Sequence, residues 1–190
     1  MTLLLNGCAL LRPSHDPQAE RAWDARRAQL AQVDRFTLQG RFAAGGIFGV
    51  KGQLHWQQNP QDFRLRLSGP FGARAVQITG DENGVAIRSA EESFHTSEPE
   101  TYLRERLGWA VPMQQLRWWV LGMPAPGTPE TVELDSAGRL LKLEQDGWTV
   151  EYAEYQTAGV PELPRKLELA NGELSVKLVV DAWSDLSTTQ

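Results

Sequence analysis

The side chains that could carry catalysis or hold a metal are few in this chain of 190 residues, and they are widely separated. The three histidines are His15, His55 and His95, and the only cysteine is Cys8. None of them stands at metal-ligand spacing from another. His55 lies on the polar side of an alternating run, where a solvated histidine is the simpler interpretation.

Carboxylates gather in polar stretches, at Glu91-Glu92 and at Glu98 and Glu100. Such clusters usually form a solvated surface. The chain has no Gly-x-Ser-x-Gly, no His-Glu-x-x-His and no glycine loop of the kind that binds phosphate. We therefore expect no catalytic residues, no metal and no cofactor.

Cys8 is placed for a different chemistry, because it follows the apolar run Leu3-Leu4-Leu5 and the small residues Asn6-Gly7. This order resembles the lipobox of bacterial lipoproteins, in which the cysteine is lipidated on sulfur and becomes the mature N-terminus. A chance Gly-Cys after leucines is the alternative. Only seven residues precede Cys8 and none is Lys or Arg, so we expect residues 1–7 to be the remnant of a signal peptide with its start upstream.

A phenylalanine stands in an unusual place, between proline and glycine in GPFG (69–72). Turn tips are usually polar because they run through water. Phe71 either folds back over the end of the sheet or points outward into something apolar. Burying such a ring is worth about 1.5–3 kcal/mol, which suits reversible contact with a membrane. Pro70 stiffens the tip, while Gly69 and Gly72 allow a tight turn.

Composition indicates one folded globular domain. Hydrophobic residues make up 41% of the chain, and the net charge of −5 offers no electrostatic reason to bind nucleic acid. No apolar stretch approaches the roughly 20 residues needed to span a bilayer, so we expect anchorage through lipid. We expect a tether and the start of the first helix in residues 8–22, a monomeric domain at 23–186 and a tail at 187–190.

The elements that position these residues follow from periodicity. Asp16-Pro17 predicts the start of a helix that runs to about Val33. Two more helices are expected, from Ser97 to Gly108 and from Pro112 to Gly122. Most of the remaining chain alternates between apolar and polar residues, which is typical of strands with one dry face.

Two dipeptide turns give the strongest strand signals. Asp146-Gly147 predicts a hairpin that pairs Leu143 with Val150 and Leu141 with Tyr152 on one face. Asn171-Gly172 predicts a hairpin that pairs Leu169 with Leu174 and Leu167 with Val176. Both hairpins match apolar with apolar, which chance rarely produces.

About ten or eleven hairpin-linked strands are expected, and one sheet of that size curls or closes. We expect the three helices in or across its interior. Such a sheet encloses more volume than its side chains fill, so an apolar ligand cavity is expected. Its candidate lining aromatics, each of which could equally be ordinary core, are Trp56, Trp119 and Trp148.

The chain resembles the LolB family of bacterial outer-membrane lipoprotein receptors, in several local patterns that occur in the family's order. These patterns are Gly40-Arg41-Phe42, Trp56-Gln57-Gln58, GPFG (69–72), GWAVPMQQLRWWVLGMP (108–124), QDGWTVEYAEY (145–155), LPRKLEL (163–169) and VKLVVDAW (176–183). The resemblance implies an incompletely closed antiparallel barrel of about eleven strands with helices in and across its interior. It also implies a receptor that takes lipoproteins from the periplasmic chaperone LolA and places them in the inner leaflet of the outer membrane, without nucleotide. Phe71 stands where the family has a membrane-inserting apolar residue, often leucine.

Three alternatives remain open from the sequence. A soluble periplasmic carrier of LolA type would share the barrel but lack lipid on Cys8. A hydrolase of acyl substrates would need a carboxylate or histidine in the cavity. A structural barrel would bind no fatty-acyl ligand.

Overall fold

The computed structural model describes residues 16–45, 49–70, 75–98, 101, 104, 112–158 and 161–188. Its two helices are α1 (Pro17–Leu30) and α3 (Met113–Trp119). Its strands are β1 (Val33–Ala44), β2 (Val50–Gln58), β3 (Phe63–Ser68), β4 (Val76–Asp81), β5 (Gly84–Arg88), β6 (Ser93–Thr96), β7 (Glu130–Leu134), β8 (Leu140–Gln145), β9 (Trp148–Gln156), β10 (Leu163–Ala170) and β11 (Ser175–Thr188).

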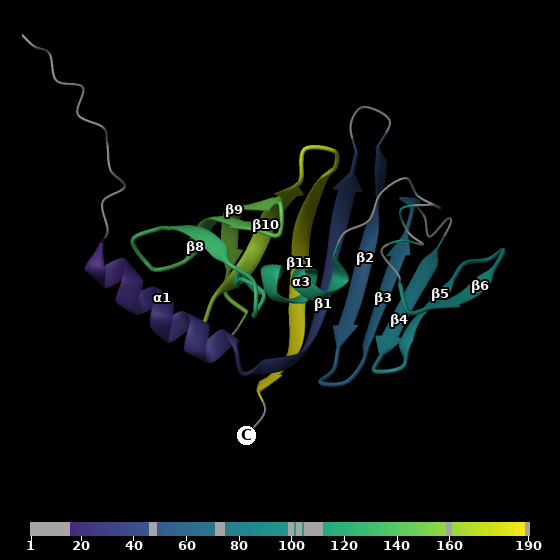
Figure 1. The fold of residues 1–190 in the computed structure, drawn as a ribbon, viewed down its shortest axis with the longest axis horizontal. Helices are drawn as coiled ribbons and strands as arrows, with labels where there is room; N and C mark the ends of the chain where they lie inside the picture. The colour runs from purple at the N-terminus through teal and green to yellow at the C-terminus, as the bar shows by residue number, and fades with distance from the viewer. Residues whose placement is uncertain are drawn as a thin grey trace, which may run out of the picture.

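All eleven strands form one sheet in the order β6-β5-β4-β3-β2-β1-β11-β10-β9-β8-β7. The pairing of β1 with β11 joins the two halves at the centre, while β6 and β7 form the edges. The predicted count of about eleven antiparallel strands is confirmed, but the sheet is open and does not close into a barrel (Figure 1). The described residues contain two helices and not three, since the helix expected from Ser97 to Gly108 lies mostly outside them.

Helix α1 begins as predicted. The Asp16 carboxylate accepts a hydrogen bond of 2.9 Å from the backbone N–H of Gln18, and Pro17 occupies the first helical position. The helix ends at Leu30 and not near Val33, because Val33 already belongs to β1 and pairs with Thr188 of β11.

A buried arginine fixes α1 against the sheet. Arg26 donates to the carbonyl oxygen of Glu162 and lies 5.3 Å from the ring centre of Tyr155. Arg139 approaches the same ring at 5.0 Å and forms ion pairs with Asp135 and Glu162. Helix α1 therefore rests on the half of the sheet formed by β7 to β10, as Figure 1 shows.

The hairpin at Asp146-Gly147 is confirmed, with Leu143 paired to Val150. The prediction for Leu141 is wrong, since its side chain is 47% exposed. The pairing of β8 with β7 shifts by one residue at this point, so Leu140 is buried in its place. A one-residue shift moves a side chain to the opposite face of a strand.

The second hairpin differs in register from the prediction. Leu169 pairs with Val176 and Leu167 with Leu178, because a four-residue loop replaces the expected two-residue turn. The Asn171 side chain forms that loop by accepting hydrogen bonds from the backbone N–H groups of two residues that follow it. A shift of two residues keeps every side chain on its face, so the apolar matching survives.

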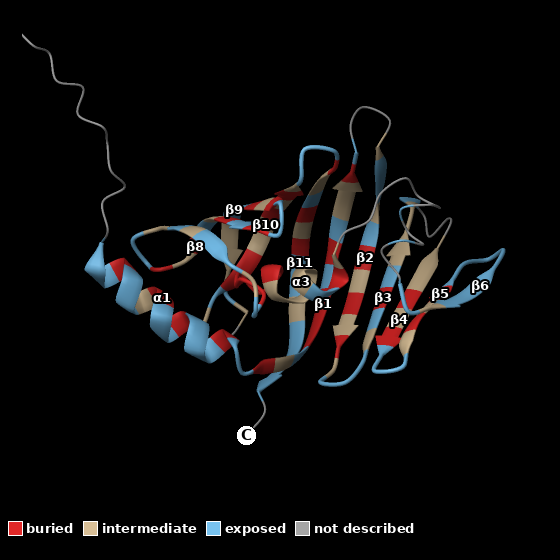
Figure 2. Cartoon of the chain, in the orientation of Figure 1, coloured by how far each residue is buried: buried red, intermediate tan, exposed pale blue. Residues whose placement is uncertain are grey.

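The core lies between the sheet and α3. Buried residues alternate with more exposed ones along the second half of β2 and around Leu178 and Val180 of β11 in Figure 2, as expected for a sheet with one dry face. Among the largest fully buried side chains are Phe36, Leu38, Trp56, Ile78 and Trp119. No helix of the described residues is both long enough and apolar enough to cross a bilayer.

Candidate functional site

A cavity of about 100 Å³ lies between α3 and the sheet. Helix α3 and the residue after it contribute Met113, Leu116 and Val120. The sheet contributes Phe42, Leu54, Trp56, Leu65, Leu67, Val76, Ile78, Leu169, Val176 and Leu178. Every lining side chain is aliphatic, aromatic or a thioether, so this cavity favours hydrocarbon over any charged ligand.

A buried glutamine anchors the C-terminal end of α3. Gln145 Oε1 accepts hydrogen bonds from Trp119 Nε1 at 2.9 Å and from the Ala125 N–H at 2.8 Å. Its Nε2 donates to the Ala125 carbonyl oxygen at 2.8 Å and to Thr128 Oγ1 at 2.9 Å. These four bonds tie β8 to α3 and to the loop that follows it.

Tyr152 of β9 adds a second anchor, since its hydroxyl donates to the Trp119 carbonyl oxygen at 2.9 Å. Complete burial raises the pKa of Tyr152 well above its ordinary value, so the hydroxyl stays protonated and able to donate. Helix α3 is therefore held at its C-terminal end, while Met113 and Leu116 near its N-terminal end border the cavity.

The three predicted aromatics occupy two places. Trp56 lines the cavity and contacts Phe36 edge to face, with ring centres 5.4 Å apart. Trp119 and Trp148 pack on one another with ring centres 6.1 Å apart, and neither is among the residues that line the cavity. Their part in this site is to hold α3, through the bond from Trp119 to Gln145.

The predicted loop and lipidation residues lie at or beyond the limits of the described residues. Gly69 and the exposed Pro70 follow directly after β3. Phe71 and Gly72 fall in residues 71–74, and Cys8 in residues 1–15, both outside the described residues. Their roles stay predictions.

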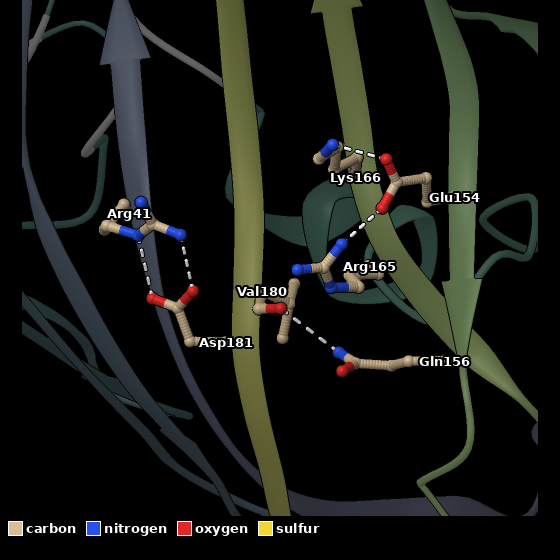
Figure 3. Close-up of polar contacts among 7 residues, drawn as sticks. All are labelled: Arg41, Glu154, Gln156, Arg165, Lys166, Val180 and Asp181. Carbon is tan, nitrogen blue, oxygen red and sulfur yellow. Dashed lines mark hydrogen bonds and ion pairs between the residues drawn. The ribbon is translucent and has the colours of Figure 1, made fainter.

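The opposite face of the sheet carries paired charges, which Figure 3 shows for β1, β9, β10 and β11. Arg41 donates to both carboxylate oxygens of Asp181, at 3.0 and 2.7 Å, and these bonds lower the pKa of Asp181 below its ordinary value. Glu154 accepts from Lys166 and Arg165, and the hydrogen bonds from these cations lower its pKa. Since Phe42 lines the cavity, its neighbour Arg41 projects to the other side.

A polar depression of about 320 Å³ opens on this outer face. Ser68, His55 and Asp181 all line it, and these are residue types of a hydrolytic triad. Arg41 engages both Asp181 oxygens, and no hydrogen bond joins His55 to Ser68 or to Asp181. The depression also lies on the face opposite the apolar cavity, so its geometry does not favour a hydrolase of acyl chains. The described residues contain no group of side chains suited to a metal.

Sequence reasoning missed Gln145 as the anchor of α3. The available signal was a glutamine at an inward position of the strand, two residues after Leu143 and directly before the predicted turn. A buried amide in an apolar stripe must find hydrogen-bond partners. Its partners could not be read from the sequence, because they come from a loop about twenty residues away.

Comparison with one known structure supports the fold. A DUF1329 family protein from Desulfovibrio piger superposes with a TM-score of 0.52 over 91% of this chain and 94% of that chain, at 6% identity. A LolA superfamily protein from Nitrosomonas europaea matches 90% of this chain and 94% of its own, at 11% identity and a TM-score of 0.49.

Comparison with known sequences gives the family. The model of the family described as outer membrane lipoprotein LolB matches residues 34–183. The outer-membrane lipoprotein LolB of Chromohalobacter salexigens is 36% identical over 100% of this chain and 89% of its own length. That of Stutzerimonas stutzeri is 36% identical over 96% of this chain and 91% of its own. The predicted family is confirmed, and the chain belongs to the LolB family of outer-membrane lipoproteins.

Proposed function

We propose that this protein is a lipoprotein receptor that accepts the acyl chains of lipoproteins from a LolA-type chaperone and inserts them into the inner leaflet of the outer membrane. The observation that supports this function most directly is the wholly apolar cavity under α3, in a chain of the LolB family. Each CH₂ group that the cavity removes from water is worth roughly 0.8 kcal/mol. Such a site can hold a hydrocarbon chain without any polar recognition.

The cavity must enlarge to take its cargo. Its volume of about 100 Å³ is below the 150 Å³ or so of an apolar cavity that admits benzene. Helix α3 is the element whose displacement would enlarge it, because Met113 and Leu116 close one side. Since Gln145 and Tyr152 hold the C-terminal end of α3, we expect the N-terminal end to swing away from the sheet.

Transfer through such a cavity needs no nucleotide. The free energy of the cargo falls at each step when the receptor binds acyl chains more tightly than the chaperone does and less tightly than the bilayer does. A small cavity that opens only when occupied suits this intermediate affinity, because part of the burial energy is spent in displacing α3.

The loop after β3 is the proposed delivery element. Phe71 stands three residues after Ser68, the last residue of β3. Insertion of Phe71 into lipid would bring the receptor to the membrane surface, and lipid on Cys8 would keep the whole chain there. An unmodified Cys8 in protein extracted from membranes would instead favour a soluble carrier.

Delivery of a purified lipoprotein from a LolA-type chaperone to liposomes tests this function. We expect Phe71→Glu to abolish delivery and to leave uptake from the chaperone intact, because the substitution removes apolar contact with lipid and leaves the cavity unchanged. The matched control is Leu141→Glu, which places the same charge at an exposed leucine of β8. Wild-type delivery by Phe71→Glu would refute the loop's role, and failure of the wild-type protein to take up cargo would refute the receptor function.

A further inference from the structure

Four exposed cations on the outer face of β2, β3 and β5 have no carboxylate partner among the described residues. We call Lys51, Arg64, Arg66 and Arg88 the cationic face. Every ion pair between described residues instead involves α1, β1 or the half of the sheet from β7 to β11, with its turns. The cationic face therefore groups four such charges on one part of the sheet, in a chain whose net charge is −5. Arg35 of β1 is a further exposed arginine for which no ion pair is found within the part of the chain that the structure describes.

Strand register brings two of these cations into one row. Arg66 pairs with Gln77 of β4, and Gln77 pairs with Arg88 of β5. Neighbouring strands lie about 4.8 Å apart, so the two arginine backbones are roughly 10 Å from one another. Leu65 and Leu67 line the cavity, so the intervening Arg66 projects from the opposite face.

The cationic face adjoins the loop that we propose to enter the membrane. Arg66 precedes the last residue of β3 by two positions, and Phe71 follows Arg66 by five. At about 3.3 Å per residue, the backbone of Arg66 lies at most roughly 17 Å from that of Phe71. The polar layer of one leaflet is about 5–8 Å thick, and charges act over a further 8 Å or so in physiological salt. A long arginine side chain at Arg66 is therefore within reach of lipid phosphates when the ring of Phe71 touches hydrocarbon.

We propose that the cationic face binds the phosphate groups of anionic lipids and orients the receptor on the bilayer while the loop inserts. The polar depression beside Arg66, which His55, Ser68 and the ion pair of Arg41 with Asp181 also line, offers room for such a group. This inference rests on the proposed function, because it assumes that the loop meets a membrane. An acidic segment of the chaperone is the competing partner, and vesicles without protein distinguish lipid phosphate from it.

Sedimentation with vesicles tests this proposal, using the full chain with Cys8→Ala so that lipid on the cysteine does not mask weak binding. One set of vesicles is pure phosphatidylcholine, and the other contains about one-third phosphatidylglycerol. We expect wild-type binding to rise on the anionic vesicles and to lose this gain in high salt. Arg66→Gln should reduce the gain about five-fold, and Arg64→Gln by less, because Arg64 lies farther from the loop. Arg66→Lys should keep most of it.

Two controls separate this proposal from the proposed function. Lys142→Gln removes one charge from β8, far from the loop, and should leave the gain unchanged. Phe71→Glu should lower binding to both kinds of vesicle. If Phe71→Glu has no effect while Arg66→Gln removes the gain, the loop's role fails and the cationic face stands. If Arg66→Gln binds anionic vesicles like the wild type, the cationic face is refuted, and a loss of chaperone binding in that variant would assign it to the acidic partner.

Discussion

Replacing Gln145 by leucine should destabilise the protein more than the small change in side-chain volume suggests. Leucine has nearly the volume of glutamine but cannot form hydrogen bonds. The substitution would leave Trp119 Nε1 and both backbone groups of Ala125 buried without their partner. Each orphaned buried group costs about 1–3 kcal/mol, so we expect the three together to cost roughly 3–9 kcal/mol. That is a large part of the total stability of a typical domain, which is about 5–15 kcal/mol.

Equilibrium unfolding in urea measures this loss. With a slope of about 3 kcal/mol per molar urea, the midpoint should fall by roughly 1–3 M. Because the orphaned groups tie α3 to the sheet, the variant should also admit a fluorescent fatty-acyl probe faster than the wild type. Stopped-flow mixing with the probe would report that difference.

Gln115→Leu is the matched control. Gln115 lies on α3 and donates one exposed hydrogen bond of 3.1 Å to Asp146. The loss of an exposed bond should cost less than about 0.5 kcal/mol and leave the midpoint nearly unchanged. Equal midpoints for the two variants would show that Gln145 does not anchor α3, and the proposed opening of the cavity would lose its fixed end.

Two further predictions concern the anchor and the turn beside α1. Cys8→Ala should yield a folded protein that stays in the aqueous phase when membranes are removed, and its aggregation would contradict the tether at residues 8–22. Burial opposes ionisation of Asp135, but hydrogen bonds from the backbone and guanidinium of Arg139 leave its pKa below the ordinary value. The stabilising effect of the Asp135 carboxylate is therefore complete above its pKa in the unfolded chain, about 3.9. This effect is lost as the pH falls through its lower pKa in the folded protein. Asp135→Asn should lower the urea midpoint at pH 7 more than at pH values near 3, and an equal loss at both would contradict this ionic role.

Local rules predicted the elements whose contacts are local. Asp16-Pro17 was sufficient for the start of α1, because the cap involves only the next residues. Strand faces followed from alternation and survived even the two-residue shift at Asn171. The prediction for Leu141 failed because the shift in β8 arises from the pairing of β8 with β7. The alternation of apolar and polar residues carries no information about that pairing. Alternation could not decide whether the sheet closes for the same reason, since closure depends on whether two distant edges meet. Incomplete closure was implied only by the resemblance to the LolB family.

The candidate site shows a similar division. Trp56 lies on a well-formed alternating strand, and its inward direction could be predicted from its neighbours. Trp119 and Trp148 were placed correctly among apolar residues but not at the cavity, because packing against α3 decides which of them line it. The hydrogen bonds of Gln145 depend on the path of the loop after α3, which no local pattern in the sequence specifies.

Strands β2 and β3 connect the two surfaces on which the proposed function depends. Their inward residues Leu54, Leu65 and Leu67 line the cavity, and the outward Arg64 and Arg66 of β3 belong to the cationic face. A one-residue slip of β3 would bring guanidinium groups into the apolar cavity and leucines to the surface that faces lipid phosphate. The observed register requires a glycine where β3 ends, because a Cβ at Gly52 would lie 2.2 Å from the Ser68 carbonyl oxygen. Glycine permits this close approach, and in this register a single strand pairing positions both the proposed site for acyl chains and the proposed membrane surface.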